Sequence, residues 1–274
     1  MNDNFYMQRA IELAKNGIGF VNPNPLVGAV IVKDNTIVAE GYHAKYGDLH
    51  AERNAFKYCD TNNIDCSNAT MYVTLEPCCH YGKQPPCTEA IVEHGISKVV
   101  IGSRDPNPLV SGKGVEYLRS NGIEVITDFM RSECDKLNDI FFHYITTKIP
   151  YVIMKFATTL DGKISSYSGK SRWISCEQSR EHTHQTRKRV SAIMVGIGTV
   201  LADNPMLTCR VENPSNPIRI VCDSGLRIPL DCNLVTTSKD VPTYVATISN
   251  DTEKISQLES LSVKVIKTQS KNGK

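Results

Sequence analysis

Short runs of consecutive apolar residues alternate with segments of helical periodicity along the first half of the chain, and this alternation constrains the fold most strongly. Runs that are apolar at successive positions are typical of strands buried on both faces of a sheet. The sequence therefore predicts an α/β fold with helices on both sides of a sheet. The predicted strands cover residues 27–32, 36–40, 70–75, 98–102 and 124–127, the first two as a β-hairpin; the predicted helices cover residues 6–14, 49–59, 85–94, 114–120 and 131–147.

A second α/β pattern begins near residues 148–150, and 274 residues are enough for two domains that each bury a core. We therefore predict one domain over residues 1–147 and a second over residues 148–274. The strands predicted for the second domain cover residues 151–157, 192–195, 218–222 and 242–247.

Charge and apolar content narrow the classes of function. The formal net charge is +2, and no block of basic residues suggests a nucleic-acid-binding surface. The N-terminus lacks the basic stretch and apolar run of a signal peptide, and no apolar run is long enough to span a bilayer. Ten cysteines in such a chain indicate reduced thiols or metal ligands. We expect a cytoplasmic protein that binds neither nucleic acid nor membrane.

Three residues have the chemistry and spacing of a catalytic zinc site. His50 opens the second predicted helix, Cys78 follows a buried strand, and Cys87 comes directly after two prolines at the head of a helix. Catalytic zinc takes three protein ligands and keeps a fourth position for water. Glu52 lies two residues after His50, where a carboxylate that is not a ligand can move protons during hydrolytic deamination. The sequence therefore predicts a zinc-dependent deaminase with Glu52 as its catalytic residue.

Two features leave alternatives open at this point. A purely structural zinc site would need a fourth protein ligand, which Cys79 or His80 can supply. The two zinc cysteines are also nine residues apart, instead of the three of the usual Pro-Cys-x-x-Cys pattern. A non-catalytic zinc-stabilised binding module therefore stays a competing hypothesis, although it has no use for Glu52.

Longer motifs resemble a known family. The first half carries N-P-N-P-L-V-G-A-V-I-V, G-Y-H, H-A-E, T-L-E-P-C-C-H-Y-G-K-Q-P-P-C and D-P-N-P-L-V-S-G-K-G, and the second half carries K-F-A-T-T-L-D-G-K-I, S-R-W-I and V-G-I-G-T-V-L-A-D-N-P. Together they resemble the bifunctional riboflavin-biosynthesis deaminase/reductase. The resemblance implies a cytidine-deaminase-like three-layer αβα domain, a dihydrofolate-reductase-like α/β domain and a homo-oligomer.

The resemblance also implies two reactions on one small, phosphorylated pyrimidine. The zinc site would remove the ring 2-amino group of 2,5-diamino-6-ribosylamino-4(3H)-pyrimidinone 5′-phosphate as ammonia, and NADPH would then reduce the ribosyl chain to ribityl. On the family pattern the deaminase substrate is bound by Asn24, His43, Lys83, Asp105 and Asn107. Lysine and histidine suit a phosphate, whereas aspartate and asparagine suit ribose hydroxyls and base edges. A deaminase of cytidine, dCMP or tRNA adenosine is the alternative, but it has no use for the segment between Cys78 and Cys87.

For the reductase half, the resemblance implies two sets of residues. The NADPH site would consist of Ala157, Trp173, Thr199, Asp203 and Ser224, and the sugar phosphate would be held by Ser171, Arg187, Leu207 and Arg210. Glycines 196 and 198 follow a predicted strand, where they let a nucleotide phosphate approach the backbone. Family members continue into a glycine-rich segment that this chain lacks before its end at residue 274, so the sequence predicts a C-terminally short reductase domain and leaves its NADPH-dependent activity open.

Overall fold

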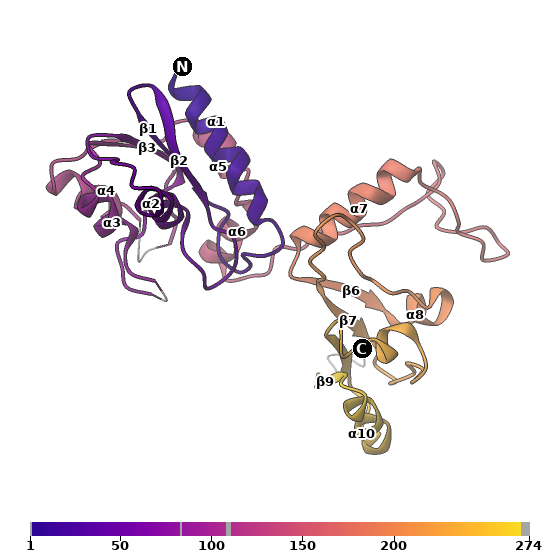
Figure 1. Ribbon diagram of the computed structural model, residues 1–274. Helices are drawn as coiled ribbons and strands as arrows, with labels where there is room; N and C mark the ends of the chain where they lie inside the picture. Colours follow the sequence, from indigo (N-terminus) through magenta and orange to yellow (C-terminus); the bar gives the residue numbers. More distant parts are fainter. Residues whose placement is uncertain (1, 83, 108–110, 270–274) are drawn as a thin grey trace. The chain divides into compact units, whose positions relative to one another are not determined.

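The computed structural model describes residues 2–82, 84–107 and 111–269 of the chain. It divides into two compact units, residues Met1–Met154 and Lys155–Lys274, each with its own sheet (Figure 1). The boundary predicted after residue 147 falls at the end of the last helix of the first unit. None of the helices in the described ranges is long and apolar enough to cross a lipid bilayer.

The first unit is built on a five-stranded sheet in the order β2-β1-β3-β4-β5. The strands are β1 (Gly28–Lys33), β2 (Thr36–Tyr42), β3 (Thr70–Leu75), β4 (Lys98–Ser103) and β5 (Glu124–Ile126). Strand β1 pairs antiparallel with both β2 and β3, and β3, β4 and β5 are parallel. The predicted hairpin and the other predicted strands of this half are confirmed.

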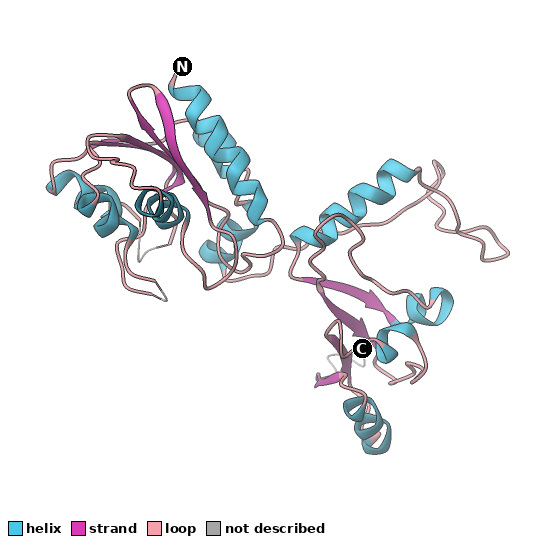
Figure 2. Ribbon diagram, viewed as in Figure 1, coloured by secondary structure: helices cyan, strands magenta, loops and turns pink. Residues whose placement is uncertain are grey.

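Helices cover both faces of this sheet, which confirms the three-layer αβα architecture (Figure 2). Alternate strand residues separate the two cores: Ile31 and Met71 pack with α2 (Ala51–Thr61), α3 (Cys87–Glu93) and α4 (Lys113–Ser120). Val30 and Tyr72 pack on the other face with α1 (Asp3–Ala14), which the short 3₁₀ turn Lys15–Gly17 follows, and with α5 (Arg131–Asp135). Both faces are buried, so the strands are apolar at successive positions.

Helix α2 lies directly against strand β2, and this contact fixes the first turn of the helix. A methyl group on Gly41 would lie only 2.2 Å from the backbone oxygen of Ala51, so no larger residue fits there without moving the helix. The N-cap of α2 is His50, and not Asp48, the polar residue that precedes the helix predicted over residues 49–59. The backbone of His50 is extended, so the residue stands just outside the helix that begins at Ala51.

The predicted helix over residues 131–147 is wrong in its middle: it is two helices, α5 and α6 (Asp139–Thr147). The break occurs at Asn138, whose buried side chain accepts a hydrogen bond from Leu26 N (2.7 Å) and donates one to Leu26 O (2.9 Å). These two side-chain bonds hold Leu26 and the loop that contains Asn24 against the junction of α5 and α6.

The second unit contains a parallel four-stranded sheet in the order β6-β7-β8-β9. The strands are β6 (Ala192–Gly196), β7 (Ile218–Cys222), β8 (Thr243–Thr247) and β9 (Lys264–Lys267), and the helices are α7 (Glu177–Arg189), α8 (Ile197–Asp203), α9 (Asn233–Thr236) and α10 (Thr252–Ser260). Its core joins Val221 and Val245 of the sheet to Val200, Leu234 and Leu258 of the helices. The strands predicted at residues 192–195, 218–222 and 242–247 are confirmed.

The strand predicted over residues 151–157 is wrong, because this segment forms neither strand nor helix. The side chains of Val152 and Met154 are each 81% exposed. An extended segment needs a neighbouring strand to satisfy its N–H and C=O groups. None of the strands that the structure describes pairs with it.

Candidate active site

Three side chains from separate elements meet at the end of the first sheet. His50 caps α2, Cys78 follows β3, and Cys87 is the first residue of α3. His50 Nδ1 lies 3.5 Å from Cys78 Sγ and 3.4 Å from Cys87 Sγ, and all three ligand atoms lie within 4.8 Å of one another. The three residues that the sequence predicts as metal ligands are therefore brought together.

This cluster fits zinc in number, chemistry and size. Zinc bonds of about 2.0–2.1 Å to nitrogen and about 2.3 Å to sulfur, at tetrahedral angles, place nitrogen and sulfur ligands about 3.5 Å apart. The nitrogen–sulfur distances here agree with that value. Among the described residues, neither Cys79 nor His80 belongs to the cluster. Three protein ligands are the number typical of a catalytic zinc site rather than a structural one.

The two cysteines carry different charges before any metal arrives. Hydrogen bonding from the Cys87 thiol and proximity to the His50 ring lower the pKa of Cys78 to about 4, and the backbone N–H of Cys87 also donates to Cys78 Sγ at 3.4 Å. The same hydrogen bond to Cys78, together with burial, raises the pKa of the Cys87 thiol. Cys78 is thus already a thiolate at neutral pH, and one proton must leave Cys87 when a metal binds.

Glu52 lies beside this cluster on the first turn of α2 and is almost fully buried. Burial raises the pKa of its carboxyl group, and the negative charge of Cys78 raises the pKa further. Glu52 does not belong to the group of ligand atoms, although it lines the same cavity. A buried carboxyl group with a raised pKa, close to a metal cluster but outside it, suits proton transfer.

The cluster opens into a cavity of about 290 Å³. Four of the five side chains predicted to bind the deaminase substrate line this cavity together with His50, Glu52 and Cys78: Asn24, His43, Asp105 and Asn107. Lys83, the fifth, lies outside the described residues. The cavity therefore brings predicted substrate residues from three separate segments to the predicted metal site.

His43 acts on the cavity through Asn24. Its Nδ1 lies 3.0 Å from the carbonyl oxygen of Leu49, which can only accept, so Nδ1 carries the proton. Burial lowers the pKa of His43, which keeps the ring neutral, and Nε2 then accepts from Nδ2 of Asn24 at 3.2 Å. This orientation directs the amide oxygen of Asn24 to accept a hydrogen bond from a ligand, and a neutral His43 brings no positive charge for a phosphate.

Asp105 is the acid among the residues predicted to bind the deaminase substrate, and its pKa is raised. It is 7% exposed, and burial raises its pKa to about 6. Its carboxylate accepts a hydrogen bond from the backbone N–H of Asn107 at 2.8 Å. The carboxylate is therefore ionised at neutral pH and oriented by the same turn that carries Asn107.

Several residues that line the cavity have no predicted role in the sequence, among them Glu76, Gln84 and Phe141. Gln84 donates to Gly47 O at 3.2 Å and so joins the segment between the zinc cysteines to the loop after β2. An acidic residue at the end of a buried strand was the one available signal for Glu76. Phe141 comes from α6, and no local pattern connects it to the cavity.

In the second unit, the residues predicted for NADPH fall into two places. Thr199 and Asp203 on α8 and Ser224 after β7 are exposed near the carboxyl ends of parallel strands. Trp173 is also exposed and lies 4.2 Å from the Arg180 guanidinium, measured to the ring centroid. Ala157 and Trp173 belong to a stretch that contains no helix or strand.

The carboxyl edge of the second sheet fits a nucleotide cofactor. Added methyl groups on Gly196 and Gly198 would meet no atom within 4 Å, so the backbone between β6 and α8 is open to a ligand. Ligands of parallel α/β sheets bind outside the carboxyl ends of the strands, where hydroxyl and carboxylate side chains hydrogen-bond ribose. Thr199, Asp203 and Ser224 supply such groups in an exposed position.

Two of the residues predicted for the sugar phosphate, Arg187 and Arg210, lie against Thr208. Arg187 donates to Thr208 O at 3.0 Å, and Arg210 donates to Thr208 Oγ1 at 3.5 Å. Burial and the positive charge of Arg210 lower the pKa of Arg187. A bound anion such as a phosphate would stabilise both guanidinium charges. The side chain of Leu207 is buried in the core, so only its backbone can contact a phosphate; Ser171 lies in the segment without helix or strand.

Comparisons with known proteins agree with the division of the chain into two units. Residues 1–103 match the family model of the cytidine and deoxycytidylate deaminase zinc-binding region, and residues 150–272 match that of the RibD C-terminal domain. The riboflavin biosynthesis protein RibD of Actinobacillus pleuropneumoniae is 58% identical over 272 residues, which cover 99% of this chain and 72% of that protein. RibD of Aquifex aeolicus is 45% identical, over 96% of this chain and 73% of that protein.

Solved structures give the same result. A diaminohydroxyphosphoribosylaminopyrimidine deaminase/5-amino-6-(5-phosphoribosylamino)uracil reductase from Thermotoga maritima is 44% identical with a TM-score of 0.85, covering 97% of this chain and 80% of that one. RibD of Acinetobacter baumannii is 39% identical with a TM-score of 0.86, covering 98% of this chain and 74% of that one. These matches cover nearly the whole chain, and the chain therefore belongs to the RibD family of riboflavin biosynthesis proteins.

Proposed function

We propose that the first unit removes the ring 2-amino group of 2,5-diamino-6-ribosylamino-4(3H)-pyrimidinone 5′-phosphate, as the deaminase of a bifunctional RibD enzyme in riboflavin biosynthesis. This proposal rests on one observation. The buried carboxyl group of Glu52 and the cluster formed by His50, Cys78 and Cys87 lie at the same cavity. This arrangement provides a metal with an open position and a separate proton carrier. A non-catalytic zinc module would need neither.

Hydrolytic deamination forms one carbon–oxygen bond and breaks one carbon–nitrogen bond. Zinc, when held by the three ligands, lowers the pKa of water enough to supply hydroxide near neutral pH. Glu52 accepts the proton that the attacking water gives up and passes it to the ring nitrogen. It then takes the proton of the added hydroxyl group and delivers it to the amino group, which leaves as ammonia while the carbonyl forms. Its raised pKa favours holding the proton between these transfers.

The substrate is positioned by the four predicted residues that line the cavity. The amide oxygen of Asn24, oriented by the neutral His43, accepts from a donor on the base or the ribose. Asp105 and Asn107, which line the same cavity, hydrogen-bond the ribose hydroxyls or the base edge. Lys83 stays the prediction for the phosphate, since its position between the two zinc cysteines puts it within reach along the sequence.

The second unit supplies the NADPH-dependent reduction of the ribosyl chain. Thr199, Asp203 and Ser224, with Ala157 and Trp173, are proposed to bind the nucleotide at the open carboxyl edge of the sheet. Arg187 and Arg210 are proposed to hold the sugar phosphate, with Ser171 and the backbone of Leu207. The residue assignments rest on the family pattern and on the exposure and charge described above.

A zinc site that includes two thiolates requires reduced cysteines, which favours a reducing compartment such as the cytoplasm. The expected homo-oligomer stays a prediction. Its mass in solution tests it.

Replacing Asp105 with Asn should weaken substrate binding while stabilising the fold. The folded-state pKa of about 6 lies above the ordinary value of 3.8, so ionisation destabilises the native state as the pH rises through this window. At pH 7 Asp105→Asn should raise the free energy of unfolding by about 1–2 kcal/mol, read from urea unfolding. The KM for the pyrimidine should rise roughly tenfold, because a neutral amide forms weaker hydrogen bonds than a carboxylate.

The pH profile separates binding from stability at this residue. In the wild type, KM should rise as the pH falls below about 6 and Asp105 becomes protonated. In Asp105→Asn that rise should be absent. A variant with wild-type KM throughout would show that Asp105 does not contact the substrate.

The function itself is tested with the purified chain and the phosphorylated diaminopyrimidinone, with and without NADPH. Ammonia release without NADPH is the expected result for the first unit, and subsequent NADPH oxidation is the expected result for the second. Cytidine, dCMP and a tRNA with a reactive adenosine serve as competing substrates. Ammonia from one of those, and none from the diaminopyrimidinone, would contradict the proposal.

A further inference from the structure

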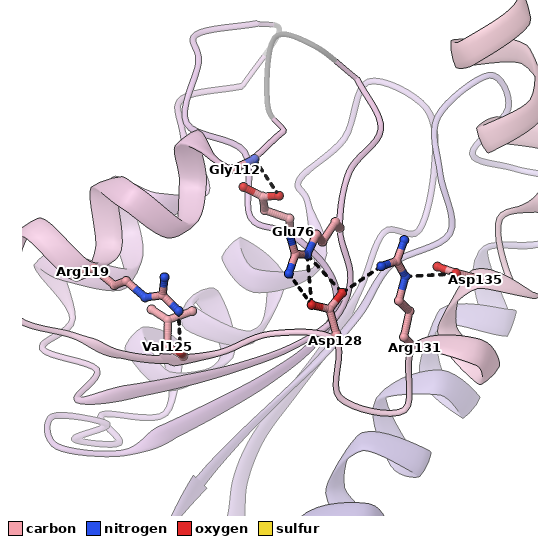
Figure 3. Close-up of polar contacts among 8 residues, drawn as sticks. Glu76, Gly112, Arg119, Val125, Asp128, Arg131 and Asp135 are labelled. Atoms are coloured by element: carbon pink, nitrogen blue, oxygen red, sulfur yellow. Dashed lines mark hydrogen bonds and ion pairs between the residues drawn. The ribbon is translucent and has the colours of Figure 1, made fainter.

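Glu76 is a buried carboxylate that the proposed chemistry does not use. It follows β3 directly and is 3% exposed. Its Oε2 accepts a hydrogen bond from Gly112 N at 3.1 Å, and its Oε1 accepts from Gly114 N at 3.1 Å and Val115 N at 3.4 Å. Figure 3 shows the bond between the carboxylate and Gly112. Three backbone donors therefore converge on one side chain two residues before the zinc ligand Cys78.

The backbone of Glu76 makes a further contact that concerns the same segment. Its N–H donates to Ser103 O at 2.9 Å, at the last residue of β4. Asp105 and Asn107 lie between Ser103 and Gly112 in the chain. Glu76 is thus bonded to both ends of the segment that carries these two predicted substrate residues.

Hydrogen bonds continue from Gly112 to the cavity. Ser111, next to Gly112, donates its N–H to Asn107 O at 2.9 Å, and Asn107 donates its N–H to Asp105 at 2.8 Å. The start of α4 also packs tightly on the ligand segment, since a methyl group on Gly114 would lie 2.3 Å from Pro77 O. The positions of Asp105 and Asn107 are therefore tied to the segment that bears Cys78.

We propose that Glu76 is a positioning residue of the deaminase: it holds Asp105 and Asn107 at a fixed distance from the metal ligand Cys78, and through them it sets where the substrate's ribose and base lie. The proposal rests on the function proposed above. Glu76 lies outside the ligand cluster, although it lines the same cavity. It acts through the hydrogen bonds to Ser103 and Gly112.

Glu76→Gln separates this role from simple capping of α4. A glutamine has one acceptor oxygen, which the two donors Gly114 and Val115 retain at the Oε1 position. Its NH₂ group then faces the N–H of Gly112, where two donors repel each other. The variant therefore keeps the helix end and releases the segment that carries Asn107.

Glu76→Gln should raise the KM for the diaminopyrimidinone about tenfold, which corresponds to one hydrogen bond to a charged group. The kcat should change less than about threefold, and one equivalent of zinc should stay bound. The dissociation constant of the same substrate, measured by calorimetry in a Glu52→Gln background without turnover, should rise by the same factor. Glu116→Gln is the matched control, an exposed glutamate in the first turn of α4, and should leave all values unchanged.

Gly112→Ala disturbs the same segment at Gly112, the backbone partner of Glu76. Gly112 has φ +79°, and a methyl group there meets no atom within 4 Å, so the substitution adds backbone strain and no clash. It should raise KM in the same way, and it decides the question if Glu76→Gln does not fold. Unchanged substrate affinity in both variants, or zinc loss with unchanged affinity, overturns the proposal. A wild-type protein that neither binds nor deaminates the substrate contradicts the proposed function instead.

Discussion

Glu52→Gln lowers the rate of ammonia release by at least about a thousandfold and leaves one equivalent of zinc bound. A glutamine keeps the shape of the buried side chain but cannot accept the proton of the attacking water, and general acid–base catalysis contributes about 10²–10⁴-fold. The rate is measured by coupled ammonia detection at saturating substrate, and zinc by elemental analysis of the same sample.

The same variant should not be less stable than the wild type. Burial raises the pKa of Glu52, so its ionised form destabilises the folded state once the pH exceeds the ordinary pKa of a glutamate. A neutral glutamine removes that effect at pH 7, and thermal unfolding should show an equal or higher midpoint. Turnover within tenfold of the wild type would mean that another group carries the proton. The exposed Glu116→Gln variant controls for the loss of a negative charge.

Cys87→Ser abolishes stoichiometric zinc binding and deamination together. Loss of an outer-shell partner of a metal site costs about 10–100-fold in affinity, and loss of one of three direct ligands should exceed a hundredfold. Serine is a poor replacement, because its hydroxyl group stays protonated near neutral pH and is a weak zinc ligand. Zinc content after dialysis and competition with a chromogenic chelator measure the change.

Cys79→Ser is the matched control for this experiment. Cys79 is the neighbour of Cys78 but lies outside the ligand cluster, so the variant should keep zinc and turnover. Zinc loss in Cys79→Ser would restore the hypothesis of a four-ligand structural site. Full zinc content in Cys87→Ser would remove Cys87 from the metal site.

The sequence predicted those features of the fold that depend on local periodicity. The strands of the first sheet are buried on both faces, and their consecutive apolar residues are recognisable without any tertiary information. The break between α5 and α6 was missed because Asn138 hydrogen-bonds Leu26, a residue 112 positions away. The extended segment 151–157 was predicted as a strand on its apolar residues alone, although strand formation depends on a neighbour.

The candidate site likewise contains residues that the sequence could predict and residues that it could not. His50, Cys78 and Cys87 could be predicted because zinc requires particular side chains, and their spacing places each at the end of an element. Glu76 was missed because its partners are backbone N–H groups at residues 112, 114 and 115, which every residue type except proline offers. The sequence therefore does not reveal which backbone groups bind the Glu76 carboxylate.

The Asn138 anchor has a consequence for the order in which the protein is made. The amide of Asn138 holds the loop that bears Asn24 by bonding both backbone groups of Leu26. During synthesis, about 110 further residues must leave the ribosome before that bond can form. The hydrogen bonds that hold this side of the pocket are therefore missing from every nascent chain that ends before Asn138.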